Sequence, residues 1–449
     1  MRSAARKAAF LAFAALSAIG CSLFVDLDGL SDGGSSGVLS DATTSDGPVT
    51  TIDGEVVTSD AGPLLQADGG PYLETTVTSV GAVPAATGNA QQRHVFWSES
   101  SKLWWVFYID DVDTSNLKAL TSPDFVTWTH ASSRGLSTTM ALEGRNFSFA
   151  SKTVGASDYV HVALGHYVGA EELRDAREAI HADAGIDDLE GLTITALAPF
   201  VAGVSPDGVS VALGSDGRVL AATGWSTDEG DAGGENVFRS SVAETGGGSG
   251  AFNATFANTS PTPSGANPVQ NRLLLSQKDG SLLRVWTSTR VTVDADDLLF
   301  STSGADGLSA TTPTGIFGSD PTAPVAALAQ NDWDACNLDA NVALVRRTLD
   351  GAASDTYDFT TYSNGSWAKG ASIANDPGKL GTGVVTMVVN GTLRVFAIAG
   401  DAVNSVRTTK YDGKSWGPWQ TIVGTPATRG FLAANGCGDG AHAAIVWTE

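Results

Sequence analysis

Seven times along this chain, a strand-like run is followed by a tight turn and a second, more apolar strand-like run. Four of the turns contain Asp-Gly or Asn-Gly pairs, which supply the positive φ angles that two-residue hairpin turns require. The repeats lie about 50 to 65 residues apart, a spacing that suits one four-stranded sheet per repeat. The pattern predicts an all-β fold, a β-propeller of seven four-stranded blades, with six blades as the alternative. The repeats begin at Arg93, Asn146, Val209, Arg272, Ala335, Gly383 and Phe431.

The two ends of this region predict how the ring closes. The last hairpin stops at Glu449 after two strands, and the strand-like segment 71–81 has no hairpin partner of its own. Pairing the two would remove two exposed sheet edges at once. We therefore predict one propeller domain over residues 71–449, closed by N- and C-terminal strands. Segment 170–185 departs from the strand pattern and is compatible with one helix or with a polar loop entering a strand.

Residues 1–20 have the composition of a signal peptide. Arg2, Arg6 and Lys7 precede an apolar run over residues 8–20. At about 1.5 Å per residue this run reaches roughly 20 Å, which is less than the ~30 Å hydrocarbon core of a bilayer. The segment is therefore predicted to be a secretory signal and not a membrane-spanning helix.

Residues 18–21, Ala-Ile-Gly-Cys, resemble the bacterial lipobox, with Ala18 where Leu is usual. The resemblance implies lipidation of Cys21, and Ser22 after it implies sorting to the outer membrane. Acyl chains would anchor the protein stably, since each buried CH₂ contributes about 0.8 kcal/mol. We expect a lipid-anchored protein of the bacterial outer membrane, periplasmic or surface-exposed. The alternative is a signal peptide without lipidation, followed by a chance cysteine.

Residues 21–70 are rich in Gly, Ser, Asp and Thr and contain no Lys or Arg. A segment with charges of one sign and little apolar surface cannot offset the entropy cost of ordering, and its charges extend it. We predict a disordered acidic linker between the lipidated Cys21 and the propeller.

The whole chain is acidic, with 26 Lys and Arg against 49 Asp and Glu and a formal net charge of -23. Phosphate backbones repel such a chain, which excludes nucleic acid as a partner. No CxxC or HExxH spacing indicates zinc. We expect a monomer that contacts the membrane through its lipid anchor.

A polar turn directly before a Trp occurs three times, in SPDFVTW at 122–128, YSNGSW at 362–367 and YDGKSWGPW at 411–419. We predict that each Trp caps an outer hairpin and packs between neighbouring blades. SPDFVTW also resembles the Asp-box of sialidase-like propellers and the blade motif of arabinanase-type glycosidases, although it is one residue shorter and has Val126 where Gly is expected. Segment 389–422 resembles one repeat of the seven-bladed bacterial lectins that bind fucose and related sugars. These resemblances imply a propeller and, through it, a glycan ligand.

Ligand-binding residues of a propeller are expected where first strands begin and where loops between second and third strands cross the same face. Arg93, Arg145 and Arg290 could bind a carboxylate through bidentate hydrogen bonds. His166 could titrate near neutral pH, and Trp225 could stack on a ligand ring. The full set of candidates is Arg93, Asp110, Glu143, Arg145, His166, Trp225, Arg290, Asp332 and Asp334.

Two further pairings are open. Asp332, Asp334 and Asp339 offer oxygen ligands of the kind that calcium takes, a weak candidate in a chain otherwise expected to need no cofactor. Cys336 and Cys437 could form a disulfide in an oxidising compartment, although they belong to the fifth and seventh repeats; two buried thiols are the alternative.

The main functional interpretation is a module that binds a glycan or another extracellular ligand. The alternative is a sialidase-like or other glycoside hydrolase, which needs two carboxyl groups about 5 to 10 Å apart over one pocket. The Arg motif and the Tyr/Glu pair of sialidases are not recognisable in the sequence. A protein-interaction scaffold of the cell envelope is the third interpretation, since propellers host unrelated functions.

Overall fold

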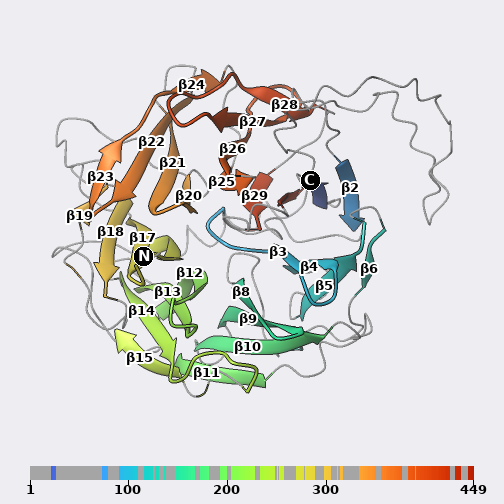
Figure 1. Cartoon of the computed structure of the whole chain (residues 1–449), viewed down its shortest axis with the longest axis vertical. Coiled ribbons are helices and arrows are strands. Elements are labelled where there is room, and N and C mark those ends of the chain that lie inside the picture. The colour runs from blue at the N-terminus through green and yellow to red at the C-terminus, as the bar shows by residue number, and fades with distance from the viewer. Residues whose placement is uncertain are drawn as a thin grey trace, which may run out of the picture.

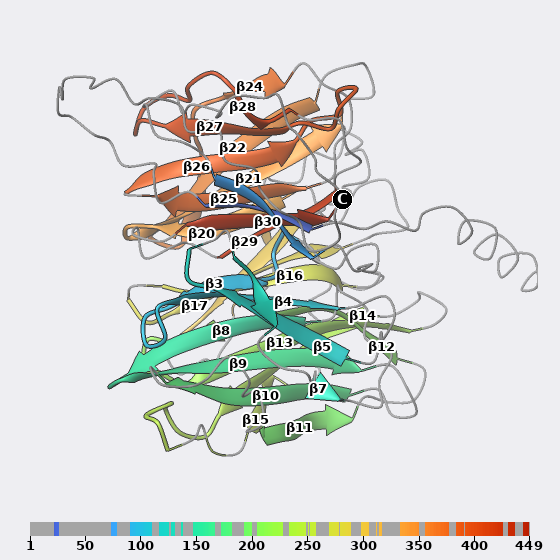
Figure 2. The same ribbon diagram turned by 90° about the vertical axis from the view of Figure 1, so that its right-hand side faces the viewer.

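A ring of β-sheets around a common centre makes up this protein, in the β-propeller arrangement (Figure 1). Seen from the side, the strands run roughly along the short axis of the disc (Figure 2). The all-β propeller predicted from the hairpin repeats is thereby confirmed. The computed structural model describes residues 22–26, 73–78, 90–109, 116–124, 127–130, 136–137, 147–166, 172–181, 193–199, 204–227, 233–247, 250, 252–256, 269–277, 279–288, 298–304, 311, 314–316, 333–349, 355–376, 383–389, 391–424, 430–435 and 443–448.

Within these residues the strands pair into seven antiparallel sheets, and in six of them the strands follow chain order from the centre outward (Figure 1). The first two are β3 (Val95–Ser98), β4 (Leu103–Ile109), β5 (Asn116–Ser122) and β6 (Thr129–His130), with β7 (Leu136–Ser137) beside β5, and β8 (Phe147–Val154), β9 (Ser157–His166), β10 (Glu172–His181) and β11 (Thr193–Pro199). The next two are β12 (Val204–Leu213), β13 (Val219–Thr227), β14 (Gly233–Ser240) and β15 (Phe252–Phe256), and β16 (Val269–Ser276), β17 (Leu282–Ser288), β18 (Leu298–Ser303) and β19 (Thr314–Gly315). The last two are β20 (Trp333–Leu338), β21 (Asn341–Leu349), β22 (Asp355–Ser363) and β23 (Ser366–Lys369), with β24 (Ile373–Asp376) beside β22, and β25 (Val384–Val389), β26 (Thr392–Ile398), β27 (Val406–Tyr411) and β28 (Gln420–Val423).

The remaining sheet closes the ring with strands from both ends of the chain, in the order β2 (Leu73–Thr78), β1 (Ser22–Asp26), β30 (Ala444–Thr448) and β29 (Gly430–Ala434). Closure by strands from both ends follows the prediction, but segment 71–81 does not pair with the C-terminal hairpin directly. Strand β1 lies between them, because it pairs with β30 on one side and β2 on the other.

Strand β1 corrects the prediction of a disordered linker that begins at Cys21. Its sequence, SLFVD, holds three consecutive apolar residues of a kind that suits a buried strand position. Pairing with β30 also covers a sheet edge that would otherwise be open. The segment between β1 and β2 lies outside the described residues.

The helix considered for segment 170–185 is not formed, since residues 172–181 make up strand β10. Strand β10 pairs along its whole length with β9 and, over its first half, with β11. Pairing on both sides therefore decides its conformation against the helical propensity of Glu, Ala and Arg. No described element is a helix long and apolar enough to cross a membrane.

The predicted role of the Trp residues after polar turns is confirmed. The Trp367 ring lies edge-on to Phe300 of the preceding sheet, with 5.7 Å between centroids, and Trp416 lies edge-on to Phe359 of its preceding sheet at 5.1 Å. Trp128 packs against a cluster that includes residues of β4 and β30. Trp367 and Trp416 thus each join two neighbouring sheets, and Trp128 packs on a cluster to which two sheets contribute.

Candidate functional site

Residues 90–94 run through the middle of the ring before they enter β3 (Figure 1). The side chains of Gln91 and Gln92 are buried there. The Gln91 amide donates to the carbonyl of Trp333 in β20, and Gln92 Nε2 donates to the carbonyl of Val209 in β12 at 3.5 Å. We call residues 90–94 the central strap, because they connect sheets on different sides of the ring.

The strap brings together two of the predicted ligand-binding residues, Arg93 and Asp334. Arg93 Nη2 lies 3.4 Å from Asp334 Oδ1, and the backbone N–H of Arg93 donates to Ser148 Oγ of β8 at 3.1 Å. The other carboxylate oxygen of Asp334 accepts from the backbone N–H and the hydroxyl of Thr386 in β25, at 2.8 and 3.1 Å. Burial raises the pKa of Asp334, while Arg93 and Thr386 act in the opposite direction.

Arg93 and Asp334 therefore pair with each other in this structure. Asp334 is fully buried, and only 11% of the Arg93 side chain is exposed. A buried carboxylate needs such donors, because leaving it unpaired costs several kcal/mol. The structure thus brings two of the predicted candidates together in one ion pair, and their contact with a ligand stays a prediction.

Two other candidates lie on different sheets. His166 is the last residue of β9 and Trp225 lies within β13, on a different sheet. Their predicted ligand contacts stay predictions. The remaining candidates, Asp110, Glu143, Arg145, Arg290 and Asp332, lie outside the described residues.

The weak calcium candidate stays a prediction, because Asp332 lies outside the described residues, and its other two members lie at opposite ends of β20. Asp339 stands in the turn after β20, exposed and with φ 54°, whereas Asp334 lies near the start of the same strand. They are five residues apart along the chain, and four of these steps run along the extended strand. The part of the chain that the structure describes holds no group of three His, Cys, Asp or Glu residues that could bind a metal. Cys336 is buried and Cys437 lies outside the described residues, so the disulfide stays a prediction.

A groove of about 730 Å³ lies between the sheet of β16–β19 and the sheet of β20–β24, on the outer side of the ring where β19 and β23 face one another (Figure 1). Its lining comes from β19, an outer strand of two residues, and from β22 and β23 of the neighbouring sheet. The lining includes Phe300, Thr314, Arg346, Asp358, Trp367 and Lys369.

An ion pair forms the floor of the groove. Arg346 and Asp358 are direct cross-strand partners on β21 and β22, and Arg346 Nε donates to Asp358 Oδ2 at 3.0 Å. Their side chains are 12% and 32% exposed, so a ligand in the groove can reach both. Thr360, two residues after Asp358, points to the same face and donates to the carbonyl of Ala368 at 2.8 Å.

Aromatic rings form one wall. Trp367 is partly exposed, lies 5.7 Å from Phe300, and packs on Tyr362, its cross-strand partner, at 5.2 Å. A two-residue turn of Asn364 and Gly365, with φ 50° and 84°, joins β22 to β23 and fixes this hairpin. The polar turn that marks the motif in the sequence therefore holds the aromatic wall in place.

The sequence singles out Trp367 for its packing, but it does not single out Arg346, Asp358 or Lys369. The sequence does contain a signal for Arg346: Arg346 and Arg347 directly follow the apolar run 342–345 within one strand. Neighbouring strand residues point to opposite faces. Arg347 is buried and donates to the carbonyl of Ile398, and Arg346 enters the groove.

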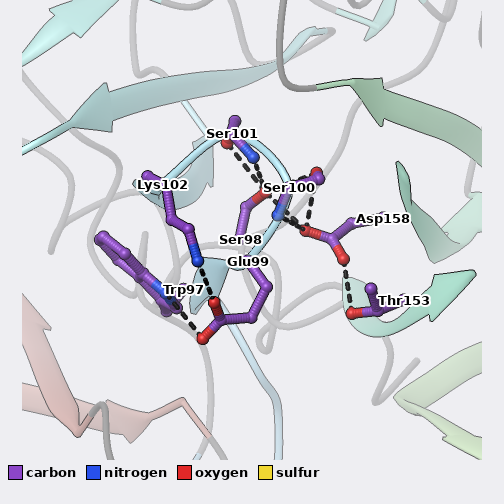
Figure 3. Close-up of polar contacts among 8 residues, drawn as sticks. All are labelled: Trp97, Ser98, Glu99, Ser100, Ser101, Lys102, Thr153 and Asp158. Carbon is purple, nitrogen blue, oxygen red and sulfur yellow. Dashed lines mark hydrogen bonds and ion pairs between the residues drawn. The ribbon is translucent and has the colours of Figure 1, made fainter. Parts of the chain in front are cut away.

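Two other polar clusters are buried between sheets. Asp158 of β9 accepts from the hydroxyls of Ser98, Ser100 and Thr153 at 2.6, 2.9 and 2.6 Å (Figure 3). Burial raises the pKa of Asp158, but these donors more than offset it, and the pKa is lowered. Asp158 is almost completely buried. Because Ser98 and Ser100 belong to the end of β3 and the turn after it, their hydrogen bonds to Asp158 hold this turn against the next sheet.

The second cluster surrounds Glu244, which follows β14 and reaches the neighbouring sheet of β8–β11. Its carboxylate accepts from Arg177 Nε and Nη2 at 2.5 and 2.9 Å and lies 3.0 Å from His161 Nε2. Neither His161 nor Glu244 has any exposed side-chain surface. Both clusters therefore join sheets and do not form open sites.

No protein-family model matches this sequence, and no curated protein matches it. Among solved structures, an ulvan lyase of polysaccharide lyase family 25, bound to a GlcA(1-4)Rha3S unit, superposes with a TM-score of 0.50 at 8% identity, over 79% of this chain and 88% of that one. The SapL1 lectin in complex with α-methyl fucoside gives 0.41 at 14% identity, over 77% and 100%. The Penicillium chrysogenum α-L-arabinanase with arabinobiose gives 0.42 at 10%, over 74% and 96%. At such identities the likeness shows the propeller fold.

Proposed function

We propose that this chain is a glycan-binding propeller whose ligand occupies the groove between the sheets of β16–β19 and β20–β24. The observation that carries the proposal is a partly exposed Trp367 beside an accessible Arg346–Asp358 pair in one concave site. An aromatic face provides apolar contact for one side of a sugar ring, and the charged pair can hydrogen-bond its hydroxyls. A groove with aromatic walls and a few polar groups is the usual composition of a small-ligand site.

The groove favours binding over hydrolysis. Asp358 is the only carboxylate among the described residues that line it, whereas most glycoside hydrolases use two. The central strap also fills the part of the ring where the carboxylate of Asp334 is located. We therefore place the proposed ligand at the rim and keep the sialidase-like hydrolase as an outcome of the test.

The proposal includes a ring of seven blades, one for each sheet, and a lipid anchor on Cys21 at the outer membrane. Strand β1 starts at Ser22, immediately after Cys21, and belongs to the sheet that closes the ring. An anchor at Cys21 would therefore adjoin the propeller itself and would not sit at the end of a long stalk. Replacing Cys21 with Ser should move the protein from the outer-membrane fraction to the soluble fraction; unchanged fractionation would contradict the anchor.

The proposed function is tested on the full chain from residue 21 onward, with Cys21 replaced by Ser for solubility. The protein is incubated with a mixed glycan pool, and retained and released species are identified by mass spectrometry. Retention of intact oligosaccharides is expected. Shortened products would make the protein a glycoside hydrolase, and a pool that is neither retained nor cleaved would favour the envelope scaffold.

The site is tested by Trp367→Ala, with Trp97→Ala as the matched control. Trp97 is also partly exposed, but it lies in β3 on a different sheet, so its loss leaves the groove intact. Removing the ring of Trp367 should weaken binding of a retained oligosaccharide about 3- to 10-fold, as measured by titration calorimetry. Equal affinities of the two variants would place the ligand elsewhere.

A further inference from the structure

We infer that the groove selects an anionic glycan, one with a carboxylate or sulfate group on the sugar that occupies it. The inference rests on the proposed function, because it names the ligand class of the same site. Its basis is a contrast in charge: the chain carries -23 overall, but the described lining of the groove holds two cations and one carboxylate.

The carboxylate in the groove is already neutralised. Asp358 accepts a hydrogen bond from Arg346, whose side chain is 12% exposed and lies deeper than that of Asp358. A charge-assisted pair of this kind is shorter and stronger than a neutral hydrogen bond, and it leaves no net charge. Lys369 therefore sets the net charge of the described lining, which is positive.

The position of Lys369 suits recognition of a charged sugar. Lys369 and Trp367 are two residues apart on β23, so their side chains leave the same face of the strand about 7 Å apart. Lys369 is exposed, whereas Trp367 is partly buried against Phe300. A sugar ring stacked on Trp367 can thus direct its anionic substituent towards the ammonium of Lys369.

Outside the groove, the protein is acidic and repels an anionic ligand, so the positive charge of the groove lining is the local source of attraction. The net charge repels an anionic chain at long range, so an anionic ligand gains only from close contact with the groove. Salt screens both the repulsion and the local attraction, and therefore cannot separate them. A neutral ligand of the same shape can separate them, because it removes the charge and keeps the ring.

The test uses short uronic acid oligosaccharides, galacturonate, glucuronate and mannuronate, each paired with its full methyl ester. A sulfated galactan oligosaccharide and its desulfated form provide the second chemistry. Affinities for the full chain with Cys21→Ser are measured by titration calorimetry. At least one anionic member should bind about 3- to 10-fold more tightly than its neutral partner, and which pair shows the preference distinguishes carboxylate from sulfate.

The variant Lys369→Met should abolish that preference, so that the anionic member binds no more tightly than its neutral partner. The matched control is Lys414→Met, which removes an exposed Lys from the turn before Trp416, outside the groove. Equal binding of anionic and neutral partners overturns the inference but not the proposed function. A preference that survives Lys369→Met overturns the role of Lys369. Failure of every sugar in this set overturns the inference alone when the mixed glycan pool is still retained, and overturns the proposed function as well when the pool is not retained.

Discussion

Two seams between neighbouring sheets of this ring are held together by opposite chemistry. In the charged seam, between the sheets of β8–β11 and β12–β15, the carboxylate of Glu244 is buried between Arg177 and His161. In the aromatic seam, between the sheets of β20–β24 and β25–β28, the rings of Tyr411 and Trp416 pack on Phe359 at 5.1 Å each. Both seams join sheets of the same architecture.

The contrast shows that the propeller fold does not prescribe the chemistry of its seams. The aromatic seam is stabilised by apolar area, which tolerates small displacements. The charged seam depends on hydrogen-bond geometry, since a buried carboxylate without its donors is strongly unfavourable. The two seams should therefore respond differently to mutation and to pH.

The largest effect is expected from Glu244→Ala in the charged seam. The substitution leaves Arg177 without its carboxylate and His161 buried beside a cavity, which should cost about 3 to 5 kcal/mol of unfolding free energy. Urea denaturation of the wild type and the variant measures this loss of unfolding free energy. Glu99→Ala is the control, because Glu99 pairs with the exposed Lys102 and should cost about 1 kcal/mol or less. Similar costs for both variants would show that the buried cluster contributes little.

Acid should weaken the charged seam and spare the aromatic one. Burial raises the pKa of Glu244, but hydrogen bonds from Arg177, the Gly246 N–H and His161 outweigh burial and lower the pKa to about 2. Because the folded pKa lies below the usual 4.5, the stabilisation is complete above about pH 4.5 and is lost as the pH falls towards 2. The loss amounts to roughly 3 kcal/mol.

The measurement compares the pH dependence of unfolding free energy for the wild-type chain and for Glu244→Gln, which does not titrate. The wild type should lose more stability than the variant between pH 4.5 and 2. The variant Trp416→Ala, which leaves Glu244 intact, should keep the steep wild-type dependence. Parallel curves for the wild type and Glu244→Gln would assign the acid sensitivity to other carboxylates.

In the aromatic seam, Trp416→Ala should cost about 2 to 3 kcal/mol. The substitution removes two contacts of the Trp416 ring. One is the edge-on contact with Phe359, in which the two ring planes cross at 88°, and the other is the contact with Tyr411. Truncation of a fully buried aromatic residue costs about 3 to 5 kcal/mol, and Trp416 is only partly buried. Urea denaturation at pH 7 and at pH 4 should give the same cost. A cost that depends on pH would mean that the aromatic seam is coupled to a titrating group.

The parts of the fold that depend on local pattern were predictable from the sequence. The Asp-Gly turns have the expected positive φ, 76° at Gly217 and 89° at Gly280, and the Trp after a polar turn joins two sheets. Strand β1 was not predictable, because five residues beside an acidic segment give no periodicity, and pairing with β30 is decided by closure of the ring.

The candidate site shows the same limit. Arg93 and Asp334 were both placed at the starts of inner strands, but only the path of the central strap decides that they face one another. The groove is lined partly by β19, whose two residues are a strand only through their pairing with β18 and belong to no motif. Sequence pattern thus located Trp367 but not the open space beside it.

The smallest effect is expected at Trp419, where the aromatic seam also contains a hydrogen bond. Trp419 Nε1 donates to the carbonyl of Ala374 at 2.7 Å, while its ring packs 4.9 Å from Tyr357. Trp419→Phe removes the hydrogen bond and keeps an aromatic ring, and should cost about 0.5 to 1.5 kcal/mol, because solvent replaces part of a lost hydrogen bond. Trp419→Ala removes both and should cost more. If both variants lose the same unfolding free energy, the hydrogen bond accounts for the whole contribution of Trp419 to the seam. If Trp419→Phe loses none, the contribution of Trp419 comes from apolar area alone.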